Sequence, residues 1–245
     1  MKNKDNSAIR VYEQEAVRAV TGPTIRPGGF SLTDRAMKFC AFSKNSRIVD
    51  AGCGCGATVN HLRANWGMDA AGVDISAKLL AQGSKTQVLP LILADAGNLP
   101  VGANTLDGLI NECVLSIMPT PQRALAEYHR VLKKNGYLII SDIYLRTDLS
   151  VQPDAIPMEK GSDSVNACFS HAVSDSIRRR QIESAGFSIL LREEHTRLLK
   201  ELAARFVFRH GSLKKFWQQI IPCGVDTTAM AAGKPGYALW IARKK

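Results

Sequence analysis

The chain has 245 residues, of which 45% are hydrophobic and 22% are charged. This balance is typical of a globular protein and excludes a disordered or fibrous one. A chain of this length buries about 70–75% of its unfolded surface, so it needs neither disulfides nor a structural metal to hold a core. The N-terminus lacks the apolar segment of a signal peptide, and no run approaches the ~20 apolar residues that cross a bilayer. We therefore expect a cytoplasmic protein without a membrane partner or metal site, whose six cysteines are free thiols.

The net charge of +10 is concentrated in the last third of the chain. Residues 1–171 carry a balance of +2, whereas residues 172–245 carry +8. The basic clusters there are Arg178-Arg179-Arg180, Lys214-Lys215 and Arg243-Lys244-Lys245. Clusters of this kind either form an ordinary solvated surface or attract an anionic partner such as nucleic acid.

Strand-like and helix-like stretches alternate from about residue 46 to residue 142, which is typical of βαβ units that build a parallel sheet. The apolar runs predict strands at 47–50, 70–74, 88–94, 106–111 and 137–142. The patterns between these strands predict a helix at 57–66, a second helix that starts after the N-cap residue Ser76, and a third at 121–134. Asn135-Gly136 would end the third helix in the left-handed cap position. Pro90 removes a ladder donor, so the third strand starts late or lies at an edge.

The regular alternation stops after residue 145. Residues 146–170 include Pro153, Pro157 and Gly161 and predict a long excursion with little regular structure. The elements predicted beyond it are a helix at 176–185, a strand at 187–192, a helix at 197–208 and a strand at 237–242. We expect a single domain over 1–245, with an N-terminal lid at 1–45, a core at 46–145, an acceptor-side insertion at 146–172 and a C-terminal part of the sheet at 173–245.

The strongest chemical signal is the segment Asp50-Ala51-Gly52-Cys53-Gly54-Cys55-Gly56, which lies directly between a predicted strand and a predicted helix. Alternate glycines let the backbone turn tightly and approach a ligand at the carboxyl end of the strand. The spacing is G-x-G-x-G, which fits a dinucleotide pyrophosphate less well than G-x-G-x-x-G. Asp74 and Asp95 end the next two strands. Aspartate is also common in ordinary turns, but three carboxylates on one rim beside the glycines favour a ligand site, where Asp74 can accept hydrogen bonds from ribose hydroxyls.

These motifs resemble those of class I S-adenosylmethionine-dependent methyltransferases, in the type 11 or UbiE-like branch. Residues 49–56 are similar to the family's first motif. The stretch Arg130-Val131-Leu132-Lys133-Lys134-Asn135-Gly136 is similar to its Arg-Val-Leu-Lys-Pro-Gly-Gly, with Lys and Asn in place of Pro and the first Gly. The resemblance covers residues 45–145 closely and the tail loosely. It implies a Rossmann-like three-layer α/β/α sandwich, whose seven-stranded sheet is mostly parallel with an antiparallel last strand.

The same resemblance implies S-adenosyl-L-methionine as the cofactor and S-adenosyl-L-homocysteine as its product. The glycine backbone would pack against the methionine portion, and Asp74 would hold the ribose diol with Ile75 beside the adenine. Asp95 would accept a hydrogen bond from the adenine amino group, and Ala96 would donate one to the ring. The cofactor-binding residues expected are Asp50, Gly52, Cys53, Gly54, Gly56, Asp74, Ile75, Asp95, Ala96, Asn111, Glu112 and Gly29.

Transfer of a methyl group from a sulfonium depends on positioning, desolvation and sometimes removal of a proton, so a fixed base is not required. Asn111 and Glu112 end the fourth strand beside the expected methyl position. Asn111 would support the cofactor through its backbone, and Glu112 would either meet the cofactor or acceptor or form an ion pair. Segments such as Gly28-Gly29 would suit a lid. The catalytic candidates are Glu112, Cys113, Cys168, Cys223 and Tyr12.

We expect a small-molecule acceptor. A narrower resemblance to arsenite methyltransferases rests on residues 110–115 and on Cys168 and Cys223, which fall where that family's acceptor-domain thiols lie. Such thiols bind trivalent arsenic as soft ligands. Val59 stands where that family has a further cysteine, and free cysteines are also common core residues. RNA methylation, prompted by the basic final third, and a non-catalytic cofactor-binding protein remain alternatives.

Overall fold

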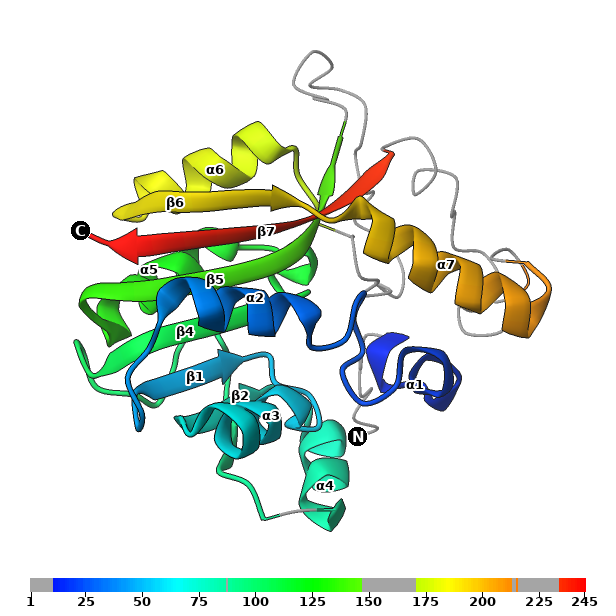
Figure 1. Cartoon of the computed structure of the whole chain (residues 1–245), viewed down its shortest axis with the longest axis horizontal. Helices are drawn as coiled ribbons and strands as arrows, with labels where there is room; N and C mark the ends of the chain where they lie inside the picture. The colour runs from blue at the N-terminus through cyan, green and yellow to red at the C-terminus, as the bar shows by residue number, and fades with distance from the viewer. Residues whose placement is uncertain (1–10, 87, 147–170, 213–214, 216–233) are drawn as a thin grey trace, which may run out of the picture.

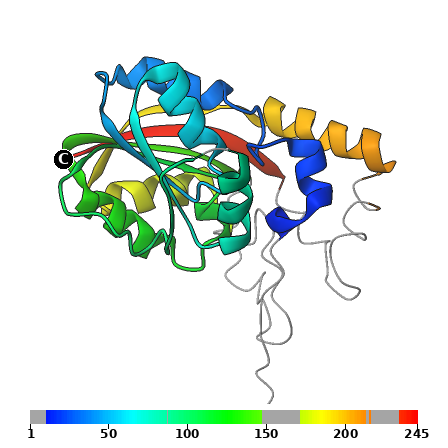
Figure 2. The ribbon, with the colours of Figure 1, turned by 90° about the horizontal axis from the view of Figure 1, so that it is seen from below.

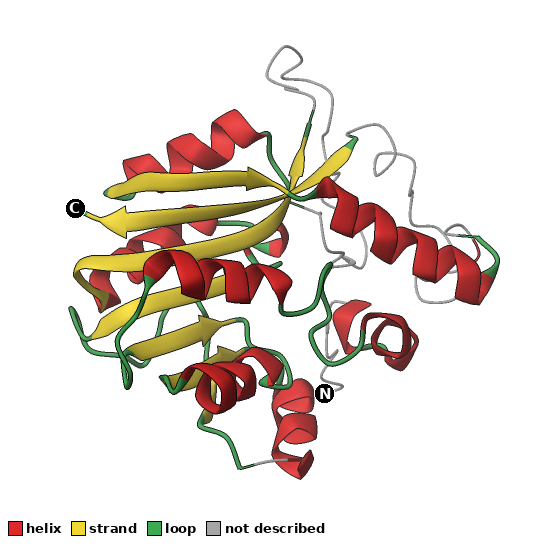
Figure 3. Ribbon diagram, viewed as in Figure 1, coloured by secondary structure: helices red, strands yellow, loops and turns green. Residues whose placement is uncertain are grey.

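The computed structural model describes residues 11–86, 88–146, 171–212, 215 and 234–245. These residues form a seven-stranded sheet of order β3-β2-β1-β4-β5-β7-β6 (Figure 1; Figure 3). The strands are β1 (Arg47–Ala51), β2 (Asp69–Asp74), β3 (Leu91–Leu93), β4 (Leu106–Glu112), β5 (Leu132–Leu145), β6 (Phe187–Glu194) and β7 (Pro235–Lys244). Neighbouring strands pair in parallel, except that β7 is antiparallel to both β5 and β6. The sheet predicted from the sequence is thus confirmed.

Helices cover both faces of the sheet and make three layers (Figure 2). They are α1 (Glu15–Thr21), α2 (Ser31–Cys40), α3 (Ala57–Trp66), α4 (Ala77–Thr86), α5 (Pro121–Val131), α6 (Asp175–Ser184) and α7 (Thr196–His210). One core layer includes Met37 of α2 and Leu62 of α3, and the other includes Leu125 of α5 and Ile182 of α6. The sequences of the central strands are nearly continuous apolar runs, because both faces of these strands are buried. In the described ranges, no helix is both long and apolar enough to cross a bilayer.

The N-terminal segment and α7 pack against each other at one end of the sheet (Figure 1). Val11 of the 3-10 helix η1 (Val11–Glu13) and Val17 of α1 share a small apolar cluster with Leu202 and Phe206 of α7. We call residues 11–30 the N-terminal cap. The cap thus packs on α7, so two described segments that are about 180 residues apart in the sequence meet beside the sheet.

Two predicted elements have other bounds in the structure. The third strand covers only Leu91–Leu93, and both its late start after Pro90 and its edge position, the two outcomes predicted from that proline, are confirmed. The prediction of a helix over 121–134 is wrong at its end: α5 stops at Val131. Leu132 already pairs with Leu106 in the sheet, so the backbone must be extended there. Asn135 does have a positive φ of 65°, but it lies within β5.

Two of the basic clusters each contain one buried residue, whereas Arg179, Arg180 and Lys245 are exposed. Arg178 is fully buried within α6, where its Nη1 donates to Gln181 Oε1 at 3.0 Å. Lys244 is 8% exposed, and its Nζ donates to Asn104 Oδ1 and to the Leu132 carbonyl, each at 2.8 Å. Long aliphatic stems allow such burial. The Lys244 ammonium finds two acceptors, whereas Nε and Nη2 of Arg178 have no hydrogen-bond partner among the described residues. Lys214 lies outside the described residues.

Candidate active site

A cavity of about 330 Å³ lies at the carboxyl ends of β1, β2 and β4, next to the N-terminal cap. Its volume is within the range of small-molecule sites. The strand order reverses between β1 and β4, and open α/β sheets bind ligands in the crevice at such a switch point. The lining comes from the cap, the glycine loop, the ends of β2 and β4, and the segment between β4 and α5.

The glycine loop, residues 52–56, is fixed against β2 by its backbone. The Gly52 and Cys53 N–H groups both donate to the Val73 carbonyl, at 2.7 and 3.0 Å. Gly52 has a φ of 92°, and a Cβ there would lie 2.2 Å from Val114 Cγ2. Only glycine fits this position, because it tolerates the positive φ and leaves room for the neighbouring side chain. Gly52, Cys53 and Gly54 all line the cavity.

The three predicted carboxylates lie on the rim of the cavity, together with Ile75 and Ala96. Asp74 is 8% exposed and accepts from Gly54 N at 2.7 Å and from Ser76 N at 2.8 Å. Ile75 presents an apolar side chain that is 53% exposed, so a carboxylate and an apolar surface stand side by side at the end of β2.

Asp50 is buried at the centre of this acidic wall, with 3% exposure. Burial raises its pKa well above the usual range, and the negative charges of Glu112 and Asp74 raise it further, whereas Arg26 opposes the shift. The cavity thus has more buried carboxylates than buried cations along its described wall. Such a wall favours a ligand that carries positive charge, and the ammonium and sulfonium groups of S-adenosylmethionine fit it.

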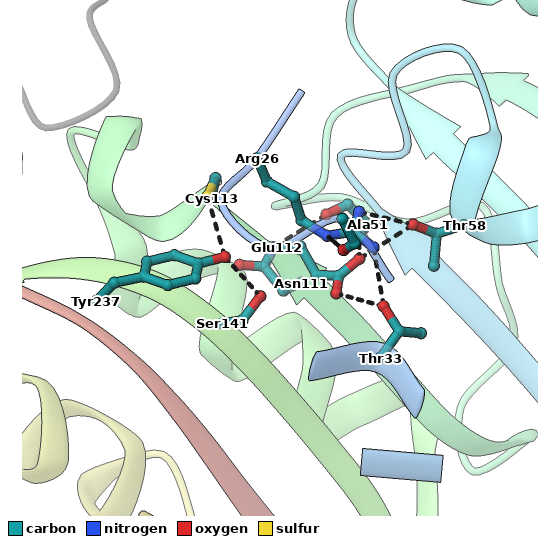
Figure 4. Close-up of polar contacts among 10 residues, drawn as sticks. Arg26, Thr33, Ala51, Thr58, Asn111, Glu112, Cys113, Ser141 and Tyr237 are labelled. Atoms are coloured by element: carbon teal, nitrogen blue, oxygen red, sulfur yellow. Dashed lines mark hydrogen bonds and ion pairs between the residues drawn. The ribbon is translucent and has the colours of Figure 1, made fainter. Parts of the chain in front are cut away.

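Glu112 at the end of β4 forms an ion pair with Arg26 of the cap, the second of the two roles predicted for it (Figure 4). Arg26 Nη1 lies 2.8 Å from Glu112 Oε2, and the two side chains are 5% and 4% exposed. The hydroxyls of Thr33 and Thr58 donate to the two Glu112 oxygens at 2.9 and 3.1 Å. Arg26 donates to the same two hydroxyls and to the Gly29 carbonyl. Both oxygens of Glu112 are therefore engaged, and the pair ties the cap to the sheet.

Cys113 follows Glu112 and also lines the cavity. Its φ of 57° is unusual for a residue other than glycine. Its Sγ donates to Tyr237 Oη at 3.6 Å, and Tyr237 Oη donates to Ser141 Oγ at 3.2 Å (Figure 4). Burial raises the pKa of Tyr237 well above its usual range, so this phenol stays protonated. Tyr12, another catalytic candidate, reaches the cavity from the cap.

Three predicted cofactor residues do not line the cavity: Gly29, Gly56 and Asn111. Gly56 is the N-cap residue before α3, with a φ of 79°, and the Gly29 carbonyl accepts from Arg26 Nε. The Asn111 side chain is fully buried, and its Nδ2 donates to the Ala51 carbonyl and to Tyr128 Oη, at 3.0 and 2.9 Å. Asn111 thus joins β4 to β1 and α5 beneath the site.

The remaining thiol candidates, Cys168 and Cys223, lie outside the described residues. Within the described part of the chain, no group of three or more His, Cys, Asp or Glu side chains could hold a metal ion.

Sequence reasoning missed Arg26, Thr33 and Thr58, the partners of Glu112. The segment around Arg26 was recognised only as a possible lid, because nothing in the local pattern connects an arginine at position 26 to a glutamate 86 residues later. A single charge among glycines and a proline was the available signal.

Residues 49–140 match the family described as "Methyltransferase domain". An arsenite methyltransferase of Halobacterium salinarum is 24% identical over 174 residues, which cover 66% of this chain and 43% of that protein. The chain spans about half the length of the curated relatives it matches.

Solved structures share the fold over nearly the whole chain. The [4+2]-cyclase SpnF superposes with a TM-score of 0.71 at 21% identity, covering 96% of this chain and 93% of its own. Phosphoethanolamine N-methyltransferase 2 of Haemonchus contortus, in complex with S-adenosyl-L-methionine, gives a TM-score of 0.70 at 17% identity and covers 94% of this chain and 56% of its own. These likenesses show the fold, and the sequence match adds the family. By that match, residues 49–140 of the chain form a methyltransferase domain.

Proposed function

We propose that this protein transfers a methyl group from S-adenosyl-L-methionine to a small-molecule acceptor. The observation that carries the proposal is the cavity wall, in which a glycine loop fixed to β2 stands beside Asp50, Asp74 and Asp95 within the segment that matches the family. The fold alone would not suffice, because a cyclase shares it.

Each rim residue would contact a different part of the cofactor. Asp74 would accept hydrogen bonds from the ribose diol, and Ile75 would cover the adenine, whose amino group Asp95 would meet. Asp50, whose pKa is raised by its burial and by the neighbouring carboxylates, would face the ammonium group. When bound, the cofactor supplies an electrophilic methyl group on its sulfonium.

The chain's own contribution to the reaction is positioning and exclusion of water. The glycine loop and the cap define the cavity, and the Arg26–Glu112 pair holds the cap in place. Both oxygens of Glu112 accept hydrogen bonds from threonine hydroxyls while it pairs with Arg26, so we assign it a positioning role rather than that of a base. An acceptor atom that already carries a lone pair, such as an amine nitrogen or a thiolate, would suit this site.

A thiophilic acceptor such as arsenite is a second candidate. It is favoured by the presence of Cys113 in the cavity wall and by the similarity to the Halobacterium protein. Cys113 would then join Cys168 and Cys223 as soft ligands. Cys113→Ser, Cys168→Ser and Cys223→Ser should each abolish methylation of arsenite. Methylation by all three variants at the rate of the unmodified protein would remove this candidate.

Calorimetric titration with S-adenosylhomocysteine, with NAD as the competing nucleotide, tests the main proposal. We expect micromolar binding of S-adenosylhomocysteine and none of NAD. Asp74→Ala should weaken binding by about 1.5–3 kcal/mol per lost charge-assisted hydrogen bond. Asp69→Ala, at the exposed opposite end of the same strand, is the matched control and should bind normally. Absence of binding to the unmodified protein would refute the proposal.

A further inference from the structure

The outer face of α7 is exposed and basic. The inner face packs Leu202 and Phe206 against the cap, and the helix runs outward from the end of the sheet (Figure 1; Figure 2). The exposed cations on its other side are Arg197, Lys200, Arg205 and Arg209. Glu201, the carboxylate on this helix, already pairs with Arg197 at 2.9 Å. We call this exposed side of α7 the basic face.

The other cations of the basic face are not neutralised by the protein. Among the described residues, Lys200, Arg205 and Arg209 have no ion-pair partner. Arg205 and Arg209 are also spaced i, i+4, where like charges repel each other and destabilise a helix. A partner that brings negative charge would remove this repulsion, so the basic face is complementary to an anionic surface.

Two apolar side chains lie within the basic face. Phe208 is 98% exposed and Val207 is 40% exposed, and Arg205 and Arg209 are their close neighbours in the sequence. A nucleic acid could stack a base on Phe208, but it offers no apolar environment to Val207. In a bilayer surface both side chains enter the boundary between headgroups and acyl chains, while the long basic side chains reach the phosphates. The combination therefore favours lipid over nucleic acid.

We propose that the basic face of α7 docks on the surface of an anionic phospholipid bilayer. The expectation of no membrane partner rested on segments that would cross a bilayer, whereas a helix of this kind lies on it. Ile25 packs against the apolar cluster of α7 and the cap, and it also lines the cavity. A docked bilayer would therefore lie beside the cap of the cavity. This inference does not depend on the proposed function.

The test is cosedimentation of the full chain with vesicles, made either of phosphatidylcholine alone or of an equal mixture of phosphatidylcholine and phosphatidylglycerol. Each basic residue near an anionic surface strengthens binding about fivefold. The three unpaired cations should therefore make binding to the mixed vesicles about a hundredfold tighter than binding to the neutral ones. Added salt should weaken it, because these charges are exposed.

The double variant Arg205→Ser/Arg209→Ser should bind the mixed vesicles about twentyfold more weakly. The matched control is Arg179→Ser/Arg180→Ser, which removes the same charge from exposed positions of α6, on a different part of the molecule (Figure 1). The control should bind nearly as well as the unmodified protein, because distant exposed charges are screened. Circular dichroism should show that both variants are folded, since all four side chains are exposed.

Phe208→Trp reports on the apolar part of the contact, and it carries the test if the double variant is unfolded. Its tryptophan emission, taken as the difference from the unmodified protein, should move to shorter wavelength when mixed vesicles are added. Val88→Trp, at a fully exposed position before β3, is the control and should show no such change.

Absence of binding to the mixed vesicles would overturn the inference. Equal weakening by the two arginine pairs would also overturn it, because binding would then follow the net charge of +10 and not the basic face. An unchanged emission of Phe208→Trp would do the same. Tighter binding to a single-stranded RNA than to the mixed vesicles would replace the bilayer with nucleic acid as the partner. Titration with S-adenosylhomocysteine tests the proposed function separately, so the two can fail independently.

Discussion

The two halves of the sheet both bury charged side chains, but they use them differently. Around β1, β2 and β4, the buried groups Asp50, Asp74 and Glu112 border a cavity. Around β5, β6 and β7, Asp142 accepts from Ser116 N, Ser116 Oγ and Ile143 N, and no described cavity adjoins it. A buried charge therefore does not by itself mark a binding site. A buried charge that borders a cavity does mark a binding site, because a ligand in the cavity can still form an ion pair or hydrogen bond with it.

Glu112→Gln is the change with the largest expected effect on this comparison. It leaves the buried Arg26 without its carboxylate, and loss of one partner of a buried pair costs about 3–5 kcal/mol. We expect about 3 kcal/mol in urea denaturation, because Asp50 is close enough to compensate in part. The control Glu201→Gln removes an exposed pair with Arg197 and should change stability little. A loss below about 1 kcal/mol would show that the Arg26 pair behaves like a surface pair.

Gly52→Ala should come next. The left-handed backbone costs about 1–2 kcal/mol for a residue with a side chain, and the clash with Val114 adds about 1–3 kcal/mol. We expect a loss of about 2–3 kcal/mol in unfolding free energy, the lower part of that sum, together with loss of S-adenosylhomocysteine binding. Gly67→Ala is matched in the sign of φ, at 64°, and has open space around the new Cβ. Gly67→Ala should lose only the stability that the left-handed backbone costs, and it should bind S-adenosylhomocysteine normally. If the two variants lose equal stability and affinity, the contact with Val114 does not explain the effect at Gly52.

We expect Asp50, in the cavity wall, to make the stability of the ligand-free protein depend on pH. Its pKa is raised in the folded protein by burial and by Glu112, so folding favours the protonated form. The ligand-free protein should therefore lose stability as the pH rises from the pKa of the unfolded chain to the raised pKa of the folded one. Over that interval the loss should be about 1.4 kcal/mol for each pH unit.

Asp50→Asn should abolish that loss and make the ligand-free protein more stable at neutral pH. The same variant should weaken S-adenosylhomocysteine binding, because the ammonium loses its partner. Thermal unfolding against pH, with and without the ligand, measures both effects. Identical pH profiles for the variant and the unmodified protein would contradict the assignment.

Lys244→Met tests the other half of the sheet and should have the smallest effect. It removes the donor to Asn104 and to the Leu132 carbonyl, which should cost about 1 kcal/mol of stability. Binding of S-adenosylhomocysteine should be unchanged, since the residue lies away from the cavity wall. The exposed neighbour Lys245 provides the control as Lys245→Met. A change in affinity for the Lys244 variant would mean that the two halves are coupled.

The amino-acid sequence by itself determined the elements of the core and the position of the glycine loop. Apolar periodicity predicted β1, α3 and β4 within a residue or two, and Asp74 and Asp95 were placed on the rim because parallel strands end at one edge of a sheet. These features depend on residues that are near one another in the chain, so they can be read from a short window of sequence.

Only the tertiary structure decided which charges meet. Arg26 and Glu112 are brought together by the cap, Arg178 and Lys244 are buried instead of solvated, and Asn111 lies beneath the cavity instead of in its wall. Each outcome depends on how distant segments pack, and the energy of a charge is set by its burial and partners in three dimensions. Local periodicity carries no information on these, because the partners lie tens of residues apart.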